Sequence, residues 1–225
     1  MDHYRDYGLR EFVYPFLLRR DNTGLSVALP ERFSTNTLVE LLSHPDPDTV
    51  KIAVVCLGLT GGMSEYGPLT ELLPASDRFT VGLIEHALCG ISFRAGTPHQ
   101  CFLLRRAVCL WAEDHKSEAM LLLNRVLVEN PGFAEAHYQR ALLLHLQGDY
   151  RAAIEDCLLA IELNPRHYGA WSHLGHARAQ IDEYPQSLES YYAALRIHPH
   201  LEGLHQAIRC LRKLVGVRGP GHLRT

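Results

Sequence analysis

The side chains most able to do chemistry in this chain are its histidines and cysteines, which bind transition metals and, for cysteine, act as nucleophiles. The 225 residues include 14 His and 6 Cys. A zinc site needs three or four converging ligands, yet the closest groupings are two pairs, His173 with His176 and His198 with His200. No cysteine or carboxylate accompanies either pair at ligand spacing. We therefore expect no metal and no cofactor, and we interpret the histidines as surface or groove residues.

The cysteines are not spaced like a disulfide or zinc framework, since no two of them form a C-x-x-C pair. Each has apolar neighbours, as Cys56 and Cys157 illustrate, so the sequence favours buried, reduced thiols. Such thiols are typical of a reducing compartment. No signal-peptide core opens the chain, and no apolar run is long enough to cross a membrane. We expect a soluble, cytoplasmic protein.

Patterns that would mark catalysis are absent. Residues 58–62 lack the lysine and the glycine spacing of a phosphate loop, and we interpret them as a loop between helices. There is no G-x-S-x-G and no H-E-x-x-H pattern. We expect no enzymatic activity. The balance of 22 Lys and Arg against 25 Asp and Glu also argues against a nucleic-acid partner.

An internal repeat of 34 residues organises the second half of the chain. Pro131, Pro165 and Pro199 mark the ends of three units. Apolar residues at helical spacing predict two helices in each unit, and the proline ends the second because it disfavours a helical residue before it. Small residues recur where the two helices must approach closely, namely Ala107, Ala141 and Gly175 in the first helices and Ala119, Ala153 and Ser187 in the second.

These units resemble the tetratricopeptide-repeat (TPR) family. The third unit matches the family pattern best, with Trp171, Leu174, Gly175, Tyr184, Tyr191, Ala194 and Pro199. The second unit departs from it, with His137 in the tryptophan place and Arg140 in the leucine place. The resemblance covers residues 98–201 and implies three TPR repeats in an all-α, right-handed superhelical solenoid.

The residues after the repeats predict an amphipathic helix. Leu204, Ile208, Leu211 and Val215 fall on one face, which would close the open apolar end of the array. We assign residues 202–225 to this capping helix and a basic tail. The basic residues suit a helix C-terminus, and a docking tail is the alternative interpretation.

The first half carries a second period, of 31 residues. Leu38, Leu41, Leu42, Asp46, Val50 and Leu57 recur as Leu69, Leu72, Leu73, Asp77, Val81 and Leu88. This pattern resembles HEAT-like repeats of phycobilin-lyase-type and bacterial scaffold proteins, with two repeats in residues 34–95. Residues 51–59 are apolar on nearly all sides, so this helix should be covered from both directions.

Residues 1–33 form an aromatic-rich N-terminal extension that fits neither period. It either packs against the first HEAT-like repeat or acts as a free peptide motif. Residues 94–98 join the two arrays, with Thr97 suited to a helix cap and Pro98 to the first helical position. This short join predicts that both arrays stack into one continuous solenoid.

The TPR resemblance also implies a binding site, because peptide ligands of the family lie along the concave face made by the first helix of each repeat. The positions on that face are Leu104, Val108, Trp111, Glu135, Tyr138, Leu142, His145, Ser172, His176 and Gln180. The groove would be apolar at its first-repeat end and neutral polar, with histidines, at the other. Alternatively, the N-terminal array covers part of the first repeat.

Relatives that clamp the acidic C-terminal tails of chaperones use Lys, Asn and Arg at five groove positions. Here those positions hold Leu104, Val108, Gln139, Gly169 and His173. Without cations a terminal carboxylate would be poorly held, so we expect an amphipathic or apolar segment of a protein as the ligand.

The leading hypothesis is a non-catalytic scaffold or adaptor that binds a peptide or helix segment in the TPR groove. The alternative is a lyase-like or chaperone-like accessory factor acting on a chromophore protein or an enzyme, suggested by the HEAT-like half and the histidines. A third hypothesis is pH-sensitive binding, because His145 and His176 share the groove and imidazoles gain charge near neutral pH.

Overall fold

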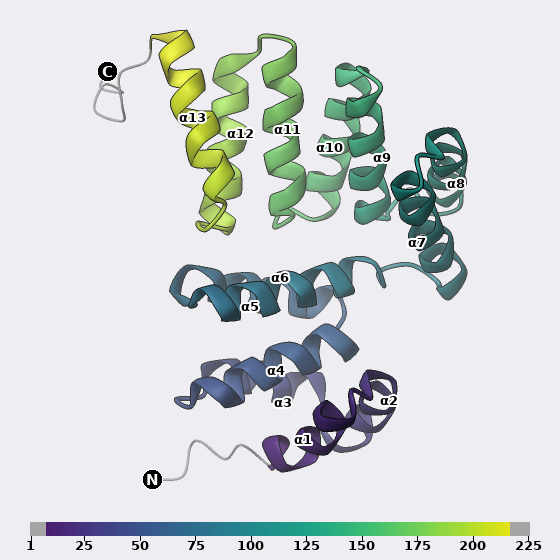
Figure 1. The fold of residues 1–225 in the computed structure, drawn as a ribbon, viewed down its shortest axis with the longest axis vertical. Helices are drawn as coiled ribbons and strands as arrows, with labels where there is room; N and C mark the ends of the chain where they lie inside the picture. Colours follow the sequence, from purple (N-terminus) through teal and green to yellow (C-terminus); the bar gives the residue numbers. More distant parts are fainter. Residues whose placement is uncertain (1–7, 217–225) are drawn as a thin grey trace. The chain divides into compact units, whose positions relative to one another are not determined.

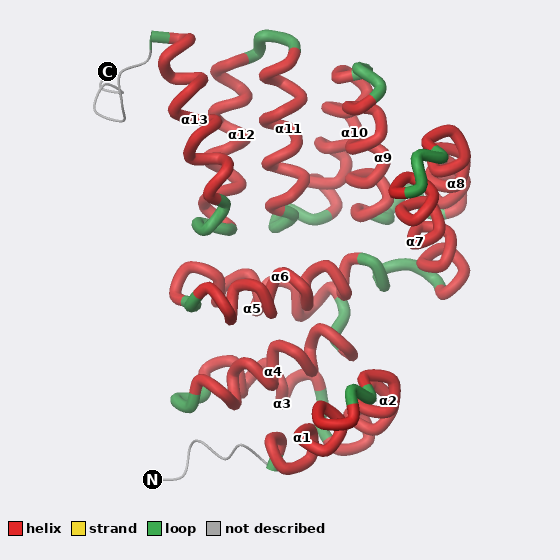
Figure 2. Tube along the Cα trace, in the orientation of Figure 1, coloured by secondary structure: helices red, strands yellow, loops and turns green. Residues whose placement is uncertain are grey.

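The computed structural model describes residues 8–216, and within that range every regular element is a helix and no strand occurs. The chain divides into two compact units, residues 1–95 and residues 96–225. Figures 1 and 2 show each unit as helices joined by short loops. None of the described helices is long and apolar enough to cross a lipid bilayer. The expected all-α helical-repeat fold is confirmed.

The first unit is built around one buried helix. Its elements are α1 (Leu9–Arg19), α2 (Asn22–Arg32), α3 (Thr35–Glu40), the 3₁₀ turn η1 (Leu41–Ser43), α4 (Pro47–Thr60), α5 (Met63–Leu72), the 3₁₀ turn η2 (Leu73–Ala75) and α6 (Arg78–Ser92). Helix α4 contacts α1, α2, α3 and α6. Its Ala53, Val54, Cys56 and Leu57 are buried, as an apolar helix surface requires.

Helix α4 is longer than the sequence indicated. It runs through Thr60, so the interpretation of residues 58–62 as a loop is wrong for the first three residues. Gly58 lies in the helix because α6 crosses it closely: a Cβ atom there would come within 2.9 Å of the Ala87 Cα atom. Only Gly61 and Gly62 connect α4 to α5. The Arg94 side chain donates to the carbonyls of Gly58 and Gly61, which otherwise end the helix unpaired.

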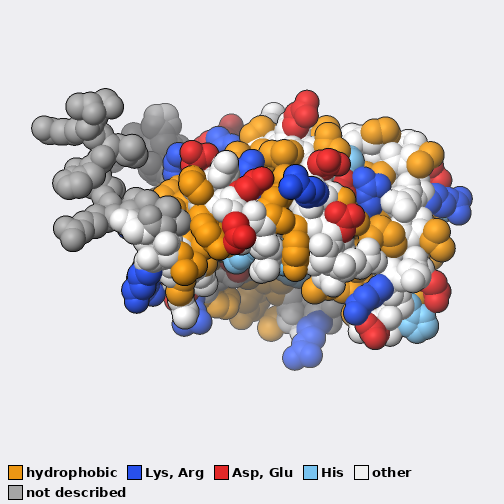
Figure 3. Space-filling model, turned by 90° about the horizontal axis from the view of Figure 1, so that it is seen from above, with side chains coloured by type: hydrophobic (Ala, Val, Ile, Leu, Met, Phe, Trp, Pro, Cys, Tyr) orange, Lys and Arg blue, Asp and Glu red, His pale blue; other side chains and the backbone are white. Residues whose placement is uncertain are grey.

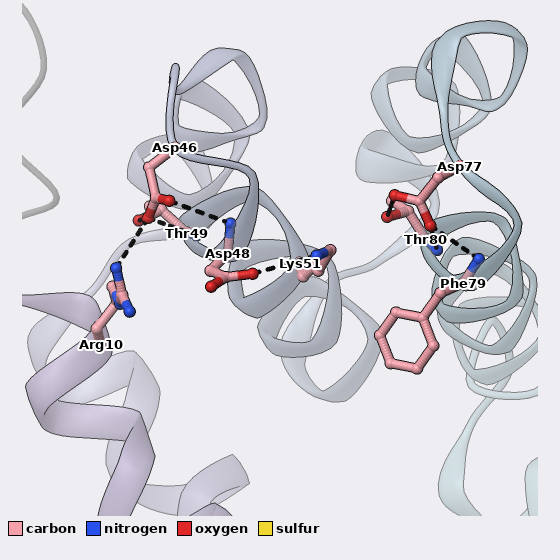
Figure 4. Close-up of polar contacts among 8 residues, drawn as sticks. All are labelled: Arg10, Asp46, Asp48, Thr49, Lys51, Asp77, Phe79 and Thr80. Atoms are coloured by element: carbon pink, nitrogen blue, oxygen red, sulfur yellow. Dashed lines mark hydrogen bonds and ion pairs between the residues drawn. The ribbon is translucent and has the colours of Figure 1, made fainter.

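The 31-residue period corresponds to a repeated way of starting a helix (Figure 4). Asp46 and Asp77 stand before α4 and α6, and each accepts hydrogen bonds from the backbone N–H and the hydroxyl of a threonine three residues later, Thr49 or Thr80. These bonds favour the charged carboxylate and lower the pKa of both aspartates. In addition, Arg10 of α1 forms an ion pair of 3.0 Å with Asp46. The HEAT-like assignment of this unit stays a prediction.

The extension predicted for residues 1–33 is largely helical. Helices α1 and α2 both contact α4 through the unit's core, and Leu9, Val13, Leu25 and Leu29 are fully buried. Pro15 lies inside α1 without ending it. Tyr4 and Tyr7, which contribute to the aromatic pattern of this segment, lie outside the described residues.

The second unit consists of three helical hairpins and a final helix. The hairpins are α7 (Pro98–Ala112) with α8 (Lys116–Glu129), α9 (Ala134–Leu146) with α10 (Tyr150–Leu163), and α11 (Tyr168–Gln180) with α12 (Tyr184–Ile197); α13 (Glu202–Val215) follows. Each hairpin turn contains a left-handed residue at the same repeat position, Asp114, Gly148 or Asp182. Consecutive hairpins contact each other through α8 with α9 and α10 with α11. The placement of this unit relative to the first, on which the expectation of one continuous solenoid depends, stays a prediction.

The sequence-predicted ends of the second unit agree with its structure. Thr97 and Gln100 form a reciprocal capping box at the start of α7, with Pro98 in the first turn. At the other end, Leu204, Ile208 and Leu211 of α13 are buried against a cluster that includes Tyr191. Helix α13 therefore closes the apolar face of the last hairpin. The side chain of Val215 and the tail at residues 217–225 lie outside the described part of the chain.

Helices α11 and α12 of the third hairpin approach each other closely at Gly175. A Cβ atom at this position would come within 2.5 Å of the Tyr191 ring and 3.2 Å of the Ser187 carbonyl oxygen. The Ser187 hydroxyl in turn donates a 2.7 Å hydrogen bond to the Gly175 carbonyl. The third hairpin therefore needs a residue without a side chain here, so that α11 and α12 can touch.

Replacing Gly175 with alanine is expected to lower the free energy of unfolding by about 1–3 kcal/mol, because the added methyl group forces Tyr191 out of its place. Chemical denaturation followed by circular dichroism measures the change. Gly203→Ala is the matched control, since a Cβ atom there meets nothing within 4 Å. If Gly175→Ala and the wild type had the same free energy of unfolding, α11 and α12 would not approach closely at this position.

Candidate functional site

The first helices of the three hairpins, α7, α9 and α11, form the face on which the sequence places ligand binding; we call it the A-helix face. Helices α9 and α11 contact each other directly. Two of the ten candidate residues are buried, Leu104 at 0% and Glu135 at 6% exposure, so a ligand could not touch them without rearrangement. His176 and Gln180 are exposed. The remaining candidates are half-buried: Val108, Trp111, Tyr138, Leu142, His145 and Ser172.

Glu135 is engaged inside the protein. One carboxylate oxygen accepts a 2.7 Å hydrogen bond from the Gln139 amide, and the other lies 3.2 Å from Nε2 of His167. His167 stands just before α11, and its Nδ1 accepts from the backbone N–H of Ala170. Because Nδ1 accepts, Nε2 carries the proton and donates to Glu135. The sequence did not link these residues, which lie 32 positions apart.

Three histidines do come together on the A-helix face, and we call His145, His173 and His176 the histidine cluster. The ring centroids of His145 and His173 are 4.7 Å apart, and those of His173 and His176 are 6.4 Å apart. Tyr191 of α12 shares a 2.8 Å hydrogen bond with His176 Nδ1. Two buried ring atoms have no hydrogen-bond partner, His145 Nδ1 and His173 Nε2. The sequence analysis predicted that His145 and His176 lie in the groove. It considered His173 only as one of the five tail-clamping positions that carry no cation here.

Desolvation by the surrounding protein lowers the pKa of all three rings, including that of His176, whose side chain is otherwise exposed, since it disfavours the charged imidazolium. The effect is largest for His173, whose pKa falls to about 4, with the neighbouring histidines adding to it. A hydrogen bond to the Ala141 backbone opposes this shift. At neutral pH the histidine cluster is therefore uncharged.

No group of three His, Cys, Asp or Glu side chains within the described residues is arranged to hold a metal ion. The view in Figure 3 shows Lys and Arg side chains interspersed with Asp and Glu and with hydrophobic residues. That face carries no patch of a single charge sign of the kind that attracts nucleic acid.

A second polar network, which the sequence analysis missed, lies inside the second hairpin. Asp156 of α10 accepts two hydrogen bonds from Arg140, at 2.7 and 2.8 Å, and one of 2.9 Å from His137 Nδ1. His137 Nε2 lies 2.9 Å from the Pro131 carbonyl oxygen, so both ring nitrogens face acceptors. The signal was available, because His137 and Arg140 are the two departures from the TPR pattern in this repeat. The sequence did not show that both side chains bond to the carboxylate of Asp156.

A cavity of about 400 Å³ adjoins this network, on the side of the second helices. It is lined by residues of α8, α9 and α10, among them Asn124, Arg140, Leu144, Asp156 and Leu159. Arg140 spans it by donating to Asn124 at 2.9 Å. Its cation is already paired with Asp156, so Arg140 offers no free positive charge to a ligand.

None of the six cysteines forms a disulfide, and only two of them are buried as expected. For Cys56 and Cys157, burial raises the pKa to about 12, which removes the thiolate needed for nucleophilic attack. The expectation of burial is wrong for Cys89, Cys109 and Cys210, which are exposed. Apolar neighbours in sequence did not predict their exposure, since adjacent residues of a helix point in different directions.

The hairpin length, the 34-residue period and the close approach at Gly175 define a helical-repeat protein of the TPR type. The tetratricopeptide repeat family model matches residues 134–167, which span α9, α10 and the loop after them. An uncharacterized protein of Methanocaldococcus jannaschii is 32% identical over 73 residues, which cover 85% of that protein and 32% of this chain. The chain belongs to the tetratricopeptide-repeat family.

Another relative is a TPR repeat-containing protein of Rhizobium etli, 26% identical over 107 residues. The match covers 47% of this chain and 52% of that protein, so the chain matches about half of the relative's length.

Solved structures share the fold at lower identity. MamA superposes with a TM-score of 0.52 at 22% identity, over 63% of this chain and 84% of MamA. The Sgt2 TPR domain from Aspergillus fumigatus gives 0.51 at 23% identity, over 54% and 82% of the two chains. The first TPR of Spaghetti (RPAP3), bound to the HSP90 peptide SRMEEVD, gives 0.51 at 19%, over 52% and 94%. These likenesses describe the fold alone.

Removing the carboxylate of Asp156 is expected to leave Arg140 and His137 without their buried partner. The Asp156→Asn variant should lose about 3–5 kcal/mol of unfolding free energy, and denaturant titration measures this. Burial alone would raise the pKa of Asp156, but the bonds from Arg140 and His137 outweigh it and lower the pKa. The ionised Asp156 therefore contributes to the free energy of unfolding at neutral pH, and this contribution is lost only as pH falls below about 3.9. The exposed neighbour Glu155→Gln is the control; if both variants changed stability equally, the network would have no special role.

The neutral state of His173 makes the stability of the protein depend on pH. Its pKa is lowered in the folded protein, so the unfolded chain binds more protons and stability falls as pH drops from 6.5 toward 4. Glutamine does not titrate in this range. Between pH 6.5 and 5 we therefore expect the free energy of unfolding of the His173→Gln variant to fall by roughly 1 kcal/mol less than that of the wild type. Thermal unfolding at several pH values measures this slope. An unchanged slope in His173→Gln, with the exposed His205→Gln as control, would contradict the assignment.

Proposed function

We propose that this protein is a non-catalytic interaction adaptor, which binds a peptide or helix segment of a partner protein along its A-helix face. The observation that carries the proposal is the row of half-buried apolar and aromatic side chains on successive first helices: Val108 and Trp111 on α7, then Tyr138 and Leu142 on α9. Side chains that are only half-buried in the free protein can bury further area against a ligand, and this is the main driving force for groove binding. The Spaghetti TPR domain, which has a similar fold, is bound to a peptide.

The chemistry of the face favours an amphipathic or apolar segment over an acidic chaperone tail. Of the five positions that hold cations or amides in tail-clamping relatives, Leu104 is fully buried and Gln139 is bonded to Glu135. None of the five carries Lys or Arg. A terminal carboxylate would therefore have no permanent cation to pair with at neutral pH.

A double variant tests the proposal, with Tyr138→Ala removing an aromatic contact and Leu142→Glu placing a charge on the face. Affinity purification with full-length wild-type and variant proteins should recover a partner that is lost, or at least tenfold depleted, with the variant. Leu158→Glu is the matched control, because Leu158 is 43% exposed on α10, among the second helices. Circular dichroism verifies that each variant is folded. Recovery of the same partners by all three proteins would place binding elsewhere.

A further inference from the structure

The cavity on the side of the second helices is open to solvent and has the size of a small-ligand site. Its volume of about 400 Å³ falls within the range of roughly 300–1,000 Å³ that such sites have. Helix α10 contributes Ala152, Glu155, Asp156 and Leu159, whose spacing places them along one side of that helix. Helix α9, which contacts both α8 and α10, contributes Leu144 among others. A long side chain of another protein can therefore enter between the three helices.

The buried part and the mouth of this cavity differ in charge. The side chains of Asp156 and Arg140 are 3% and 25% exposed and lie 2.7 Å apart, so their charges offset each other. Glu155 and Leu159 are exposed and lie at the mouth. Within the described part of the chain, the Glu155 carboxylate forms no ion pair and no side-chain hydrogen bond. The lining thus holds one uncompensated charge, which is negative, beside the apolar side chains of Leu144 and Leu159.

The third hairpin shows which group fills the corresponding space there. Arg178 of α11 stands 34 residues after Leu144, at the same repeat position. Its guanidinium donates to the Ser190 hydroxyl at 3.0 Å and to the Gln186 carbonyl oxygen at 3.2 Å, and Ser190 has the repeat position of Asp156. Leu144 is shorter than arginine and carries no charge. The space that a guanidinium occupies beside α12 is therefore left open beside α10.

We propose that this cavity binds an arginine side chain of a partner protein, with the guanidinium on Glu155 and the aliphatic stem against Leu144 and Leu159. A guanidinium is planar and weakly hydrated, so it donates two parallel hydrogen bonds to a carboxylate and leaves water more easily than an ammonium group. The stem packs on the apolar walls while the charged head stays at the mouth. An acidic ligand is disfavoured, because Glu155 repels it. The site lies on the side of the second helices and does not depend on the groove of the A-helix face.

The first arm of the test uses a single capped amino acid. The isotope-labelled full-length protein is titrated by NMR with Nα-acetyl-arginine N-methylamide and with the citrulline analogue, which has nearly the same shape and no charge. We expect the arginine compound to shift the amide signals of the cavity lining, and the citrulline compound to bind about fivefold more weakly. Added sodium chloride should weaken the arginine complex, since the mouth is exposed. Equal affinities, or no shift with either compound, would overturn the proposal.

Two variants locate the bound arginine. Glu155→Gln removes the charge and should weaken binding about fivefold. Glu189→Gln is the matched control and should bind normally, because Glu189 is exposed at the same repeat position of the third hairpin. Ala152→Leu fills the cavity without changing its charge and should abolish the shifts, while circular dichroism verifies that each variant is folded. Unchanged binding by Ala152→Leu would place the arginine on the outer surface and overturn the cavity site.

The second arm tests whether a protein segment uses the site. A displayed library of random peptides is selected on the full-length Tyr138→Ala, Leu142→Glu variant, in which the A-helix face is disabled. We expect arginine at one recurrent position, and about tenfold weaker binding of the selected peptides when Ala152→Leu is added. Peptides without a recurrent arginine, or with lysine there equally often, would overturn the proposal. Since the A-helix face is disabled in this arm, the result is independent of the proposed groove function.

Discussion

Close approach of paired helices at small residues is the constraint on which the second unit depends. Ala141, Ala153, Ala160 and Ala170 are fully buried, and at Gly175 even a methyl group has no room. Because the backbones meet there, bulky residues are excluded from the contact and lie on either side of it. Tyr191 packs directly on Gly175 and from there reaches His176. The contact that holds the third hairpin together thus also positions one ring of the histidine cluster.

The buried polar residues of this unit have a different role: they fix how neighbouring helices align with each other. The bonds from His137 and Arg140 to Asp156 join α9 to α10 within one hairpin, whereas Glu135 and His167 join α9 to the start of α11. A displacement by one helical turn would leave a buried carboxylate unpaired, at a cost well above that of an imperfect apolar contact. Apolar contacts between repeats tolerate such displacement more easily, since every repeat offers similar surfaces. We therefore interpret the two networks as determinants of alignment between helices rather than as binding groups.

The period of the sequence predicted the hairpins because the relevant signal is local. Small residues, turn positions and the prolines all lie within one 34-residue unit, and their recurrence at Pro131, Pro165 and Pro199 marks each boundary. The state of the site residues depends on side chains from other helices and was not readable in the same way. Glu135 occupies a groove position by repeat number, yet a histidine 32 residues later draws it into the interior. Likewise, the sequence indicated that Gly58 lies in a loop. It lies inside α4 instead, and a glycine is needed there because α6 crosses too closely for a side chain.

The two buried thiols lie one in each unit, Cys56 in α4 and Cys157 in α10. A thiol that is fully enclosed and whose pKa is raised to about 12 reacts with an alkylating reagent only after its surroundings open. Alkylation of Cys56 would therefore record opening of the first unit, and alkylation of Cys157 opening of the second. Peptide mass spectrometry separates the two signals from those of the exposed cysteines, which react at once. The alkylation rates of Cys56 and Cys157 would thus show whether the two units open together or independently.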